Sequence, residues 1–519
     1  MDFRELDLEL TQLDAPLPIW RVASRRDDWS ETARLVAESG GRLVSLWASD
    51  RRQGDAGGFT VSAAYATSSG LLCFELPLDD GATRYPSLAG MFPCALRMQR
   101  TIADLHGLVA DCADGTDDTR PWFNHGGWPA DRFPLRREFD GGESFPDCQV
   151  RDYPFVRVAG DGVHEIPVGP VHAGIIEPGH FRFSVVGEKV LRLEARLGYT
   201  HKGIEKRFES LPAGDGYRLA GRVSGDATVA YAWAYCMALE SAVGGREPAR
   251  ARWLRALLLE RERVANHLGD LGALGNDAAF AFGLTQFMRL KEDWLRLTKQ
   301  LCGHRLAMDR IVPGGVAFDL DAPAAERVAE QCVAIEREVI ALRRIYEDHA
   351  GLQDRFVTTG RVTPALAREL GLTGLAGRAS GFGHDLRADF PIAPYAELNA
   401  RPAGHTNGDV AARVFVRFEE ALESLRLIRG IVAALPPGDV RAPLSTPASG
   451  GFGIGWVESW RGEVLVALEI DGARIRRCHC HDPSWQNWPV LEHAVMGNIV
   501  PDFPLINKSF NLSYSGHDL

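Results

Sequence analysis

The chain has 519 residues, with 58 Lys and Arg against 69 Asp and Glu, so its net charge at neutral pH is -11. This balance argues against a general nucleic-acid binder, because such proteins need positive charge to hold phosphate backbones. The composition is 45% hydrophobic and 24% charged, with dispersed glycine and proline, which excludes collagen-like and wholly disordered classes. The length corresponds to about three domains.

The cysteine count and the lengths of the apolar segments indicate the cellular compartment of the protein. Nine scattered cysteines, an odd number, favour a reducing environment over a disulfide scaffold. Residues 1–7 have neither a basic opening nor an apolar stretch, and we find no run of about 18 uncharged apolar residues. We therefore predict a soluble, cytoplasmic protein without a transmembrane segment of its own, which reaches a membrane only through partners.

The N-terminal part predicts a small α+β domain. Apolar segments at 43–47 and 71–78 alternate with turn clusters, and a helix pattern follows at 96–108. The stretch 112–145 is rich in Asp, Gly, Pro and Arg, shows no sustained period and indicates a connector. The predicted division of the chain is a domain at 1–135, a connector at 136–165 and a large domain at 166–519.

The large domain opens with a predicted hairpin and continues with helices. Residues 181–185 and 191–197 alternate apolar and polar side chains on either side of a turn at Gly187-Glu188. Four later segments carry apolar residues at helical spacing, and four such stripes are buried most simply against each other as a bundle. These segments are 253–268, 284–301, 328–342 and 410–425. A second hairpin is predicted at 462–478 around Asp471-Gly472.

Two short motifs suggest chemistry that their context does not support. Cys478-His479-Cys480-His481 lies on a predicted strand, where successive side chains alternate faces, so the four cannot reach one metal ion. We expect two buried thiols and two outward imidazoles there. Residues 450–455 have the glycine density of a phosphate loop but lack its spacing and its strand-to-helix context, and we interpret them as a flexible turn.

The loops that border the first hairpin hold the most informative residues. Residues 169–174, 177–182 and 198–206 bring together three histidines, two glutamates and several glycines. Such loops can place polar groups beside a cavity. From the residues alone, each histidine either caps and packs or belongs to a site, and both interpretations stay open.

Together with later motifs, these segments resemble the large subunit of energy-converting NiFe hydrogenases of the formate hydrogenlyase type and its relative, the quinone-site large subunit of respiratory complex I. The resemblance covers about 165 to 519, and the N-terminal domain resembles the smaller complex I peripheral subunit that is often fused to it. The matching segments are 169–206, 266–277, 371–381, 482–488 and 508–519. The implied fold is α+β: a small N-terminal domain and a hydrogenase-large-subunit-like domain, with a central long-helix bundle flanked by β-hairpins.

Hydrogenases of this family hold nickel and iron with two C-x-x-C pairs, and this chain has lost all four thiolates. The corresponding positions are Ser224, Ala227, Ser513 and Gly516. A serine hydroxyl is not ionised near neutral pH and is a harder donor than sulfur, while alanine and glycine supply no ligand. We therefore expect no NiFe centre and no hydrogen evolution. A metal site built instead from Cys236, Cys478 and Cys480 lacks paired ligand spacing.

The resemblance to complex I implies a different function for the same fold. There the quinone headgroup is bound by a loop histidine, a supporting aspartate and a tyrosine, and this chain has His180, Asp277 and Gly225 at those positions. His180 and Asp277 are thus candidates for a quinone-type site. Arg378 is expected near the iron–sulfur cluster of a partner, or in a structural salt bridge. His201 and Glu205 are cavity candidates.

The sequence thus leads to two functional hypotheses. In the first, the chain is a peripheral subunit of a membrane-bound oxidoreductase on the cytoplasmic face, and electrons pass to a quinone or a similar small carrier. In the second, it is a redox-inactive subunit that transmits conformational change to an ion-translocating membrane arm. Both imply the same partners: a small subunit with a 4Fe-4S cluster, and antiporter-like and anchor subunits in the membrane.

Overall fold

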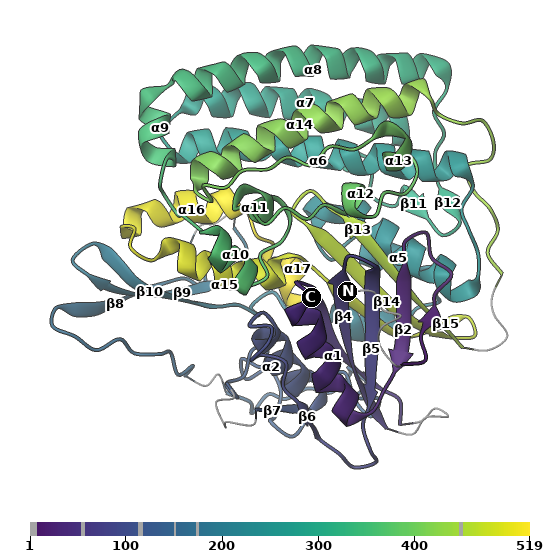
Figure 1. The fold of residues 1–519 in the computed structure, drawn as a ribbon, viewed down its shortest axis with the longest axis vertical. Coiled ribbons are helices and arrows are strands. Elements are labelled where there is room, and N and C mark those ends of the chain that lie inside the picture. Colours follow the sequence, from purple (N-terminus) through teal and green to yellow (C-terminus); the bar gives the residue numbers. More distant parts are fainter. Residues whose placement is uncertain (1–7, 53–57, 113–117, 150–151, 173–175, 446–449) are drawn as a thin grey trace.

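The computed structural model describes residues 8–52, 58–112, 118–149, 152–172, 176–445 and 450–519. The opening segment 1–7 and Ala173-Gly174 of the first loop motif lie outside the described residues. In Figure 1 a layer of long helices lies at the top, the N-terminal sheet lies at the bottom, and a β-hairpin arm extends to one side. This mixed architecture confirms the predicted α+β class.

The N-terminal domain is a five-stranded sheet that two helices accompany. The strand order is β1 (Thr11–Gln12), β2 (Ile19–Ala23), β5 (Gly70–Pro77), β4 (Phe59–Thr67) and β3 (Arg42–Asp50). Only the pair β2 and β5 is parallel. The helices are α1 (Arg26–Glu38) and α2 (Ala95–His106), and a small parallel pair joins β6 (Arg84–Pro86) to β7 (Val109–Asp111). The predicted segments at 43–47, 71–78 and 96–108 are β3, β5 and α2.

Four long helices form the bundle that the apolar stripes predicted. They are α6 (Ala249–Asp277), α7 (Ala281–Cys302), α8 (Ala322–Asp348) and α14 (Val410–Ala433). Helix α6 packs against α7 and α14, and α14 packs against α8. Asp321 and Asp409 are the N-cap residues of α8 and α14. Their side chains accept hydrogen bonds from backbone N–H groups of the first turn, at 2.8 Å each.

A second sheet joins the bundle to the N-terminal domain. Its strands are β13 (Gly451–Glu458), β14 (Glu463–Asp471) and β15 (Arg474–His481), all antiparallel, and α5 (Thr228–Val243) packs on it. The hairpin of β14 and β15 confirms the prediction, but the flexible turn expected at 450–455 is wrong. Gly451, Gly453 and Gly455 belong to β13, and glycine is required at Gly453 and Gly455 because a Cβ there would collide with backbone carbonyls of α5.

The expected outward imidazoles on β15 are also wrong. Cys478 and Cys480 are fully buried as predicted, but His479 and His481 are buried too. The second face of this sheet is covered by β3 of the N-terminal domain, where the ring of His479 stacks on Trp47 with centroids 4.9 Å apart. The sequence pattern could not reveal this cover, because it is supplied by a segment more than 400 residues away.

The first predicted hairpin is present and gains a third strand. β9 (His180–Val186) pairs with β10 (Lys189–Arg196), and β8 (Val163–Val168) adds to the other edge of β9. β8 begins within the predicted connector. In the described part of the chain, no helix is long and apolar enough to cross a bilayer.

Short elements complete the described chain. They are α3 (Ile204–Phe208), α4 (Gly216–Ala220), β11 (Ile311–Val312), β12 (Gly315–Val316), α9 (Ala350–Phe356), α10 (Pro364–Glu369), α11 (Gly374–Ala379), α12 (Leu386–Asp389), α13 (Tyr395–Leu398), α15 (Ser484–Val495), α16 (Phe503–Phe510) and α17 (Tyr514–Asp518), with single 3-10 turns at Gly225–Ala227 and Val500–Asp502.

Candidate functional site

The fold brings together the two segments at which the resemblance implies metal ligands. Ser224 precedes α5 and Ser513 precedes α17, and their hydroxyl oxygens lie 2.9 Å apart in a hydrogen bond. The Ser513 hydroxyl also accepts from the backbone N–H of Gly516 at 2.8 Å and so caps α17. Ala227 is fully buried. The positions that hold a bimetallic centre in the resembled hydrogenases are therefore adjacent here, without their sulfur.

The chain's own side chains occupy this region. A Cβ on Gly516 would collide with the carboxylate of Asp482. That carboxylate accepts from the Tyr231 hydroxyl at 3.0 Å and from the backbone N–H of Ser484 at 2.8 Å, which holds it in place. Two hydroxyls, a methyl group and a glycine do not fit a soft-metal centre. Among the described residues, no three His, Cys, Asp or Glu side chains gather in a way that could hold a metal ion.

Asp226 links the serine pair to a buried arginine. Its carboxylate accepts from the Ser224 hydroxyl at 2.7 Å and from the guanidinium of Arg461 at 2.6 Å. Arg461 also donates to the backbone carbonyl of Asn511 at 2.6 Å. Loss of water would raise the pKa of Asp226, but the Arg461 charge and the Ser224 hydroxyl outweigh it and lower the pKa. Asp226 is therefore ionised and paired at neutral pH.

A cavity opens beside Asp226. It has a volume of about 220 Å³ and lies between the start of α5, α6 and α7, with Gly225, Glu262, Asn266 and Lys291 in its wall. A Cβ on Gly225 would meet no atom within 4 Å. The absence of a side chain at Gly225, where the complex I resemblance implies a tyrosine, therefore leaves space here.

Glu262 is the titratable group of this cavity. Its carboxyl accepts from the backbone N–H groups of Val229 at 2.7 Å and Ala230 at 3.3 Å, at the first turn of α5. Burial nevertheless raises its pKa to about 8, because these two hydrogen bonds do not replace the lost water. Near neutral pH this group holds a proton that it can give up.

The two quinone-site candidates are not in hydrogen-bond contact. His180 starts β9, and its Nδ1 lies 3.2 Å from the carbonyl oxygen of Gly169 while its Nε2 accepts from Arg182 Nε at 3.3 Å. Burial lowers the pKa of His180, so the imidazole is neutral. Asp277 ends α6 at an exposed position, on the side of Lys508. Their role in a quinone site stays a prediction.

His201 and Glu205, the two cavity candidates, line the same small cavity of this chain, and their functional role stays a prediction. His201 and Glu205 line a space of about 40 Å³ between the N-terminal domain and the second sheet. The Nδ1 of His201 lies 2.7 Å from the carbonyl oxygen of Asp518. The carboxylate of Glu205 accepts from Arg477 at 3.0 Å and from His479 at 2.7 Å. Burial alone would raise the pKa of Glu205, but the Arg477 and His479 partners lower it, so this group is an ionised structural anchor.

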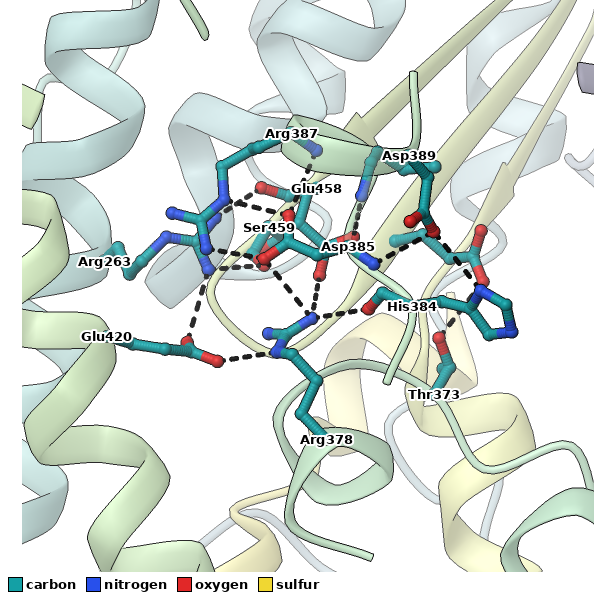
Figure 2. A network of polar contacts seen from close by, with 12 residues as sticks. Arg263, Thr373, Arg378, His384, Asp385, Arg387, Asp389, Glu420, Glu458 and Ser459 are labelled. Carbon is teal, nitrogen blue, oxygen red and sulfur yellow. Dashed lines mark hydrogen bonds and ion pairs between the residues drawn. The ribbon is translucent and has the colours of Figure 1, made fainter. Parts of the chain in front are cut away.

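Arg378 lies at the centre of a buried ion network (Figure 2). It is on α11 and fully buried, and its guanidinium donates to Glu420 at 2.7 Å and Glu458 at 2.8 Å, with Asp385 at 3.7 Å. Burial would lower the pKa of Arg378, but these carboxylates raise it. The structural salt bridge is therefore present, and the expected place beside a partner's cluster stays a prediction.

Sequence reasoning missed Asp226, Glu262, Arg461 and Asp482. One signal was available for Glu262, because residues 260–263 are four consecutive charged residues inside a helix pattern. At 3.6 residues per turn, four successive side chains point in all directions, so some of them must face the interior. Asp482 opens the matching segment 482–488 and Asp226 lies between Ser224 and Ala227, but neither was singled out as a site residue, and nothing in the local sequence marks Arg461.

The matches to family models define the class of protein. Residues 22–144 match the respiratory-chain NADH dehydrogenase 30 kDa subunit, and residues 274–449 match the 49 kDa subunit of the same enzyme. The chain thus joins two complex I peripheral-subunit types in one polypeptide, as the sequence motifs indicated.

Comparison with individual relatives shows to which family within this class the chain belongs. The chain is 31% identical over 498 residues to formate hydrogenlyase subunit 5 of Escherichia coli, a match that covers 93% of this chain and 86% of the relative. It belongs to the family of that protein. It is also 27% identical to the C/D subunit of the NADH-quinone oxidoreductase of Bacteroides thetaiotaomicron, over 75% of this chain and 76% of the relative.

A solved structure supports the fold. A chain from the membrane-bound sulfane sulfur reductase, an archaeal respiratory membrane complex, superposes with a TM-score of 0.65 at 24% identity. The match covers 70% of this chain and all of the other.

Proposed function

We propose that this chain is a peripheral subunit of a membrane-bound complex related to complex I and formate hydrogenlyase, and that electrons pass through its region to a quinone or a similar small carrier without a NiFe centre. The names of the relatives support the assembly, since they describe a formate hydrogenlyase, an NADH-quinone oxidoreductase and a respiratory membrane complex. In this proposal the chain lies on the cytoplasmic face. It contacts a small subunit with a 4Fe-4S cluster, and antiporter-like and anchor subunits hold the assembly in the membrane.

The cavity at Gly225 is the observation that carries the proposal. It adjoins Asp226, whose carboxylate accepts from the Ser224 hydroxyl, and Ser224 is bonded to Ser513, two positions where the resemblance implies the metal ligands of hydrogenases; this supports the proposal. Reduction of a quinone to a quinol takes two electrons and two protons. The partner's cluster would supply the electrons one at a time, and Glu262, with its pKa raised to about 8, would supply one of the protons. The second proton would come from solvent.

Filling the cavity tests the proposal. In the purified complex, Gly225→Leu should lower quinone-dependent turnover about tenfold or more, because the new side chain takes the space of the carrier. Glu262→Gln should lower turnover by about 10²-fold, in the range expected for removal of a general acid. Gly404→Leu is the matched control, since Gly404 is exposed and its Cβ would also meet open space.

Retained turnover in both Gly225→Leu and Glu262→Gln would contradict the proposal. His180→Ala and Asp277→Ala are measured in the same assay. If both keep full turnover, these two residues have no part in carrier binding, whatever the outcome at Gly225.

The second candidate function is that of a redox-inactive protein that couples ion translocation to the rest of the complex. The geometry of His180 favours it, because both ring nitrogens are engaged by Gly169 and Arg182 and neither is free to donate to a quinone. This version predicts that no cavity variant changes the rate of electron transfer. It also predicts that variants at the domain contacts uncouple ion transport from that rate.

A further inference from the structure

Three serine hydroxyls form a hydrogen-bonded chain that ends at the wall of the Gly225 cavity. The hydroxyl oxygens of Ser515 and Ser513 lie 3.4 Å apart, and those of Ser513 and Ser224 lie 2.9 Å apart. Ser224 in turn donates to the carboxylate of Asp226 at 2.7 Å, and Asp226 is part of the cavity wall. A hydroxyl both donates and accepts a hydrogen bond, so a continuous row of hydroxyls can pass a proton along.

The single proton on each hydroxyl fixes the direction of this chain. An ionised carboxylate only accepts hydrogen bonds, so the proton of Ser224 points to Asp226. Ser224 therefore accepts from Ser513, and Ser513, whose own proton is used in this bond, accepts from Ser515. The remaining lone pair of Ser513 accepts from the backbone N–H of Gly516 at 2.8 Å. All three hydroxyls thus donate in the direction of the cavity.

The middle of the chain of hydroxyls is buried, and its two ends are accessible. Ser513 is 5% exposed and Ser224 is 2% exposed. Ser515 is partly exposed, and its backbone N–H donates at 3.0 Å to the carboxylate of Glu177, an exposed residue. At the other end, 37% of the side-chain surface of Asp226 is accessible. Of these five residues only Asp226 lines the cavity, so the hydroxyls join the cavity to a second accessible position at Ser515.

A buried serine elsewhere shows what is unusual here. The Ser380 hydroxyl donates to the backbone carbonyl of Ala376 at 2.8 Å. A carbonyl has no proton to hand on, so this bond serves only the local turn. The Ser513 hydroxyl also has a local role as the N-cap of α17, whereas the Ser224 side chain caps no helix. The Ser224 hydroxyl therefore connects two segments of the site instead of closing a turn.

We propose that the hydroxyl chain from Ser515 to Asp226 carries a proton from solvent to the carrier in the Gly225 cavity. This inference rests on the proposed function, and it gives a path to the second proton of the reduction. Ser515 takes up a proton from solvent and gives its own to Ser513, and the transfer continues through Ser224 to the Asp226 carboxylate. Asp226 gives the proton to an oxygen of the carrier, whose electrons come from the partner's cluster. Each oxygen of the path gains one proton and loses one, and rotation of the O–H bonds restores the starting direction.

Asp226 suits the last step of this path. Arg461 and Ser224 lower the pKa of its carboxyl, so the group is ionised at rest and gives up a transferred proton readily. A carrier that fills the cavity displaces the water from it, so protons then have to come from groups of the wall. Glu262 supplies the first proton, and Asp226 delivers the second.

The variants Ser224→Thr and Ser224→Val test the path, because their side chains match in shape and differ in one hydroxyl. In the purified complex, Ser224→Thr should keep quinone-dependent turnover within about threefold of the unmodified complex. Ser224→Val should lower kcat about tenfold or more and leave the KM for quinone within about twofold, because the proton path is cut while the cavity is unchanged. The ratio of kcat in H2O to kcat in D2O should rise in Ser224→Val, since proton delivery then limits the rate. Ser380→Ala is the control, since it removes a buried hydroxyl outside the path.

Full turnover in Ser224→Val would overturn the inference. If neither Ser224→Thr nor Ser224→Val folds, Ser224→Ala decides: a lowered kcat with a raised isotope effect supports the path, and an unchanged kcat or an unchanged isotope effect overturns it. The proposed function fails separately, through retained turnover in both Gly225→Leu and Glu262→Gln. Loss of turnover in Gly225→Leu together with full turnover in Ser224→Val would keep the carrier in the cavity and exclude this proton path, so the two failures can be told apart.

Discussion

Two polar regions lie close to each other in the large domain and are built on opposite principles. Around Arg378 each cation meets carboxylates: Glu420 and Glu458 bind Arg378, Asp385 binds Arg387, and Figure 2 shows these side chains linked in one cluster. Around Gly225 the side chains surround an open space of about 220 Å³, and a Cβ on Gly225 would meet no atom within 4 Å.

The difference separates a structural cluster from a candidate binding site. The ion network ties helices α11 and α14 and strand β13 to one another through Arg378, Glu420 and Glu458. An open cavity in a well-packed domain is the kind of place where a small molecule can bind.

Removing the centre of the satisfied network should have the largest effect. Arg378→Met leaves Glu420, Glu458 and Asp385 without their shared partner and should lower the free energy of unfolding by about 3 to 5 kcal/mol. Urea denaturation measures the change. Arg289→Met, at an exposed ion pair, should cost no more than about 1 kcal/mol. A loss below about 1 kcal/mol for Arg378→Met would mean that the network does not stabilise the fold.

Glu262 should make the cavity region sensitive to pH. Its pKa is raised from 4.5 to about 8 in the folded chain, so the folded state binds the proton more tightly than the unfolded state. Stability is therefore lost as the pH rises through this interval, by at most about 1.4 kcal/mol per pH unit. Glu262→Gln should become more stable than the unmodified chain as the pH is raised from about 5 to 8. A stability difference that is constant over this range would contradict the raised pKa.

The contrast between filled and open space predicts opposite results at two glycines. Gly516→Ala should lower the free energy of unfolding by about 1 to 3 kcal/mol, because its Cβ meets the fixed carboxylate of Asp482. Gly225→Ala should change it by less than about 0.5 kcal/mol, because its Cβ meets open space. In an Asp482→Ala background, the cost of Gly516→Ala should disappear. If it persists there, the carboxylate does not fill this position.

The hydrogen-bonded hydroxyls of Ser224 and Ser513 should contribute least to the free energy of unfolding. Ser224→Ala removes the hydrogen bond to Ser513 and should cost about 1 kcal/mol, because Ser513 still accepts from Gly516 and Asp226 still binds Arg461. Thermal unfolding followed by circular dichroism measures the change. A cost above about 3 kcal/mol would show that the serine pair is a main support of the fold.

The sequence by itself determined the elements with a clear period and the identity of the lost ligands. The stripes at 253–268, 284–301, 328–342 and 410–425 specify helices α6, α7, α8 and α14, because a period of 3.6 residues leaves one face to bury. The absence of cysteine at Ser224, Ala227, Ser513 and Gly516 is read from the sequence alone, and it underlies the prediction that no NiFe centre forms, since soft-metal binding depends on atom type before it depends on geometry.

Only the tertiary structure decided which side chains meet. The glycines at 450–455 carry no period, and their role in β13 follows from the approach of α5. His479 has the pattern of an exposed strand residue and is buried by Trp47 of another domain. The hydroxyl chain that ends at Asp226 is likewise visible only in three dimensions, because Ser224 and Ser513 are 289 residues apart in the sequence. Local sequence encodes periodicity, whereas contacts between distant segments depend on how the whole chain packs.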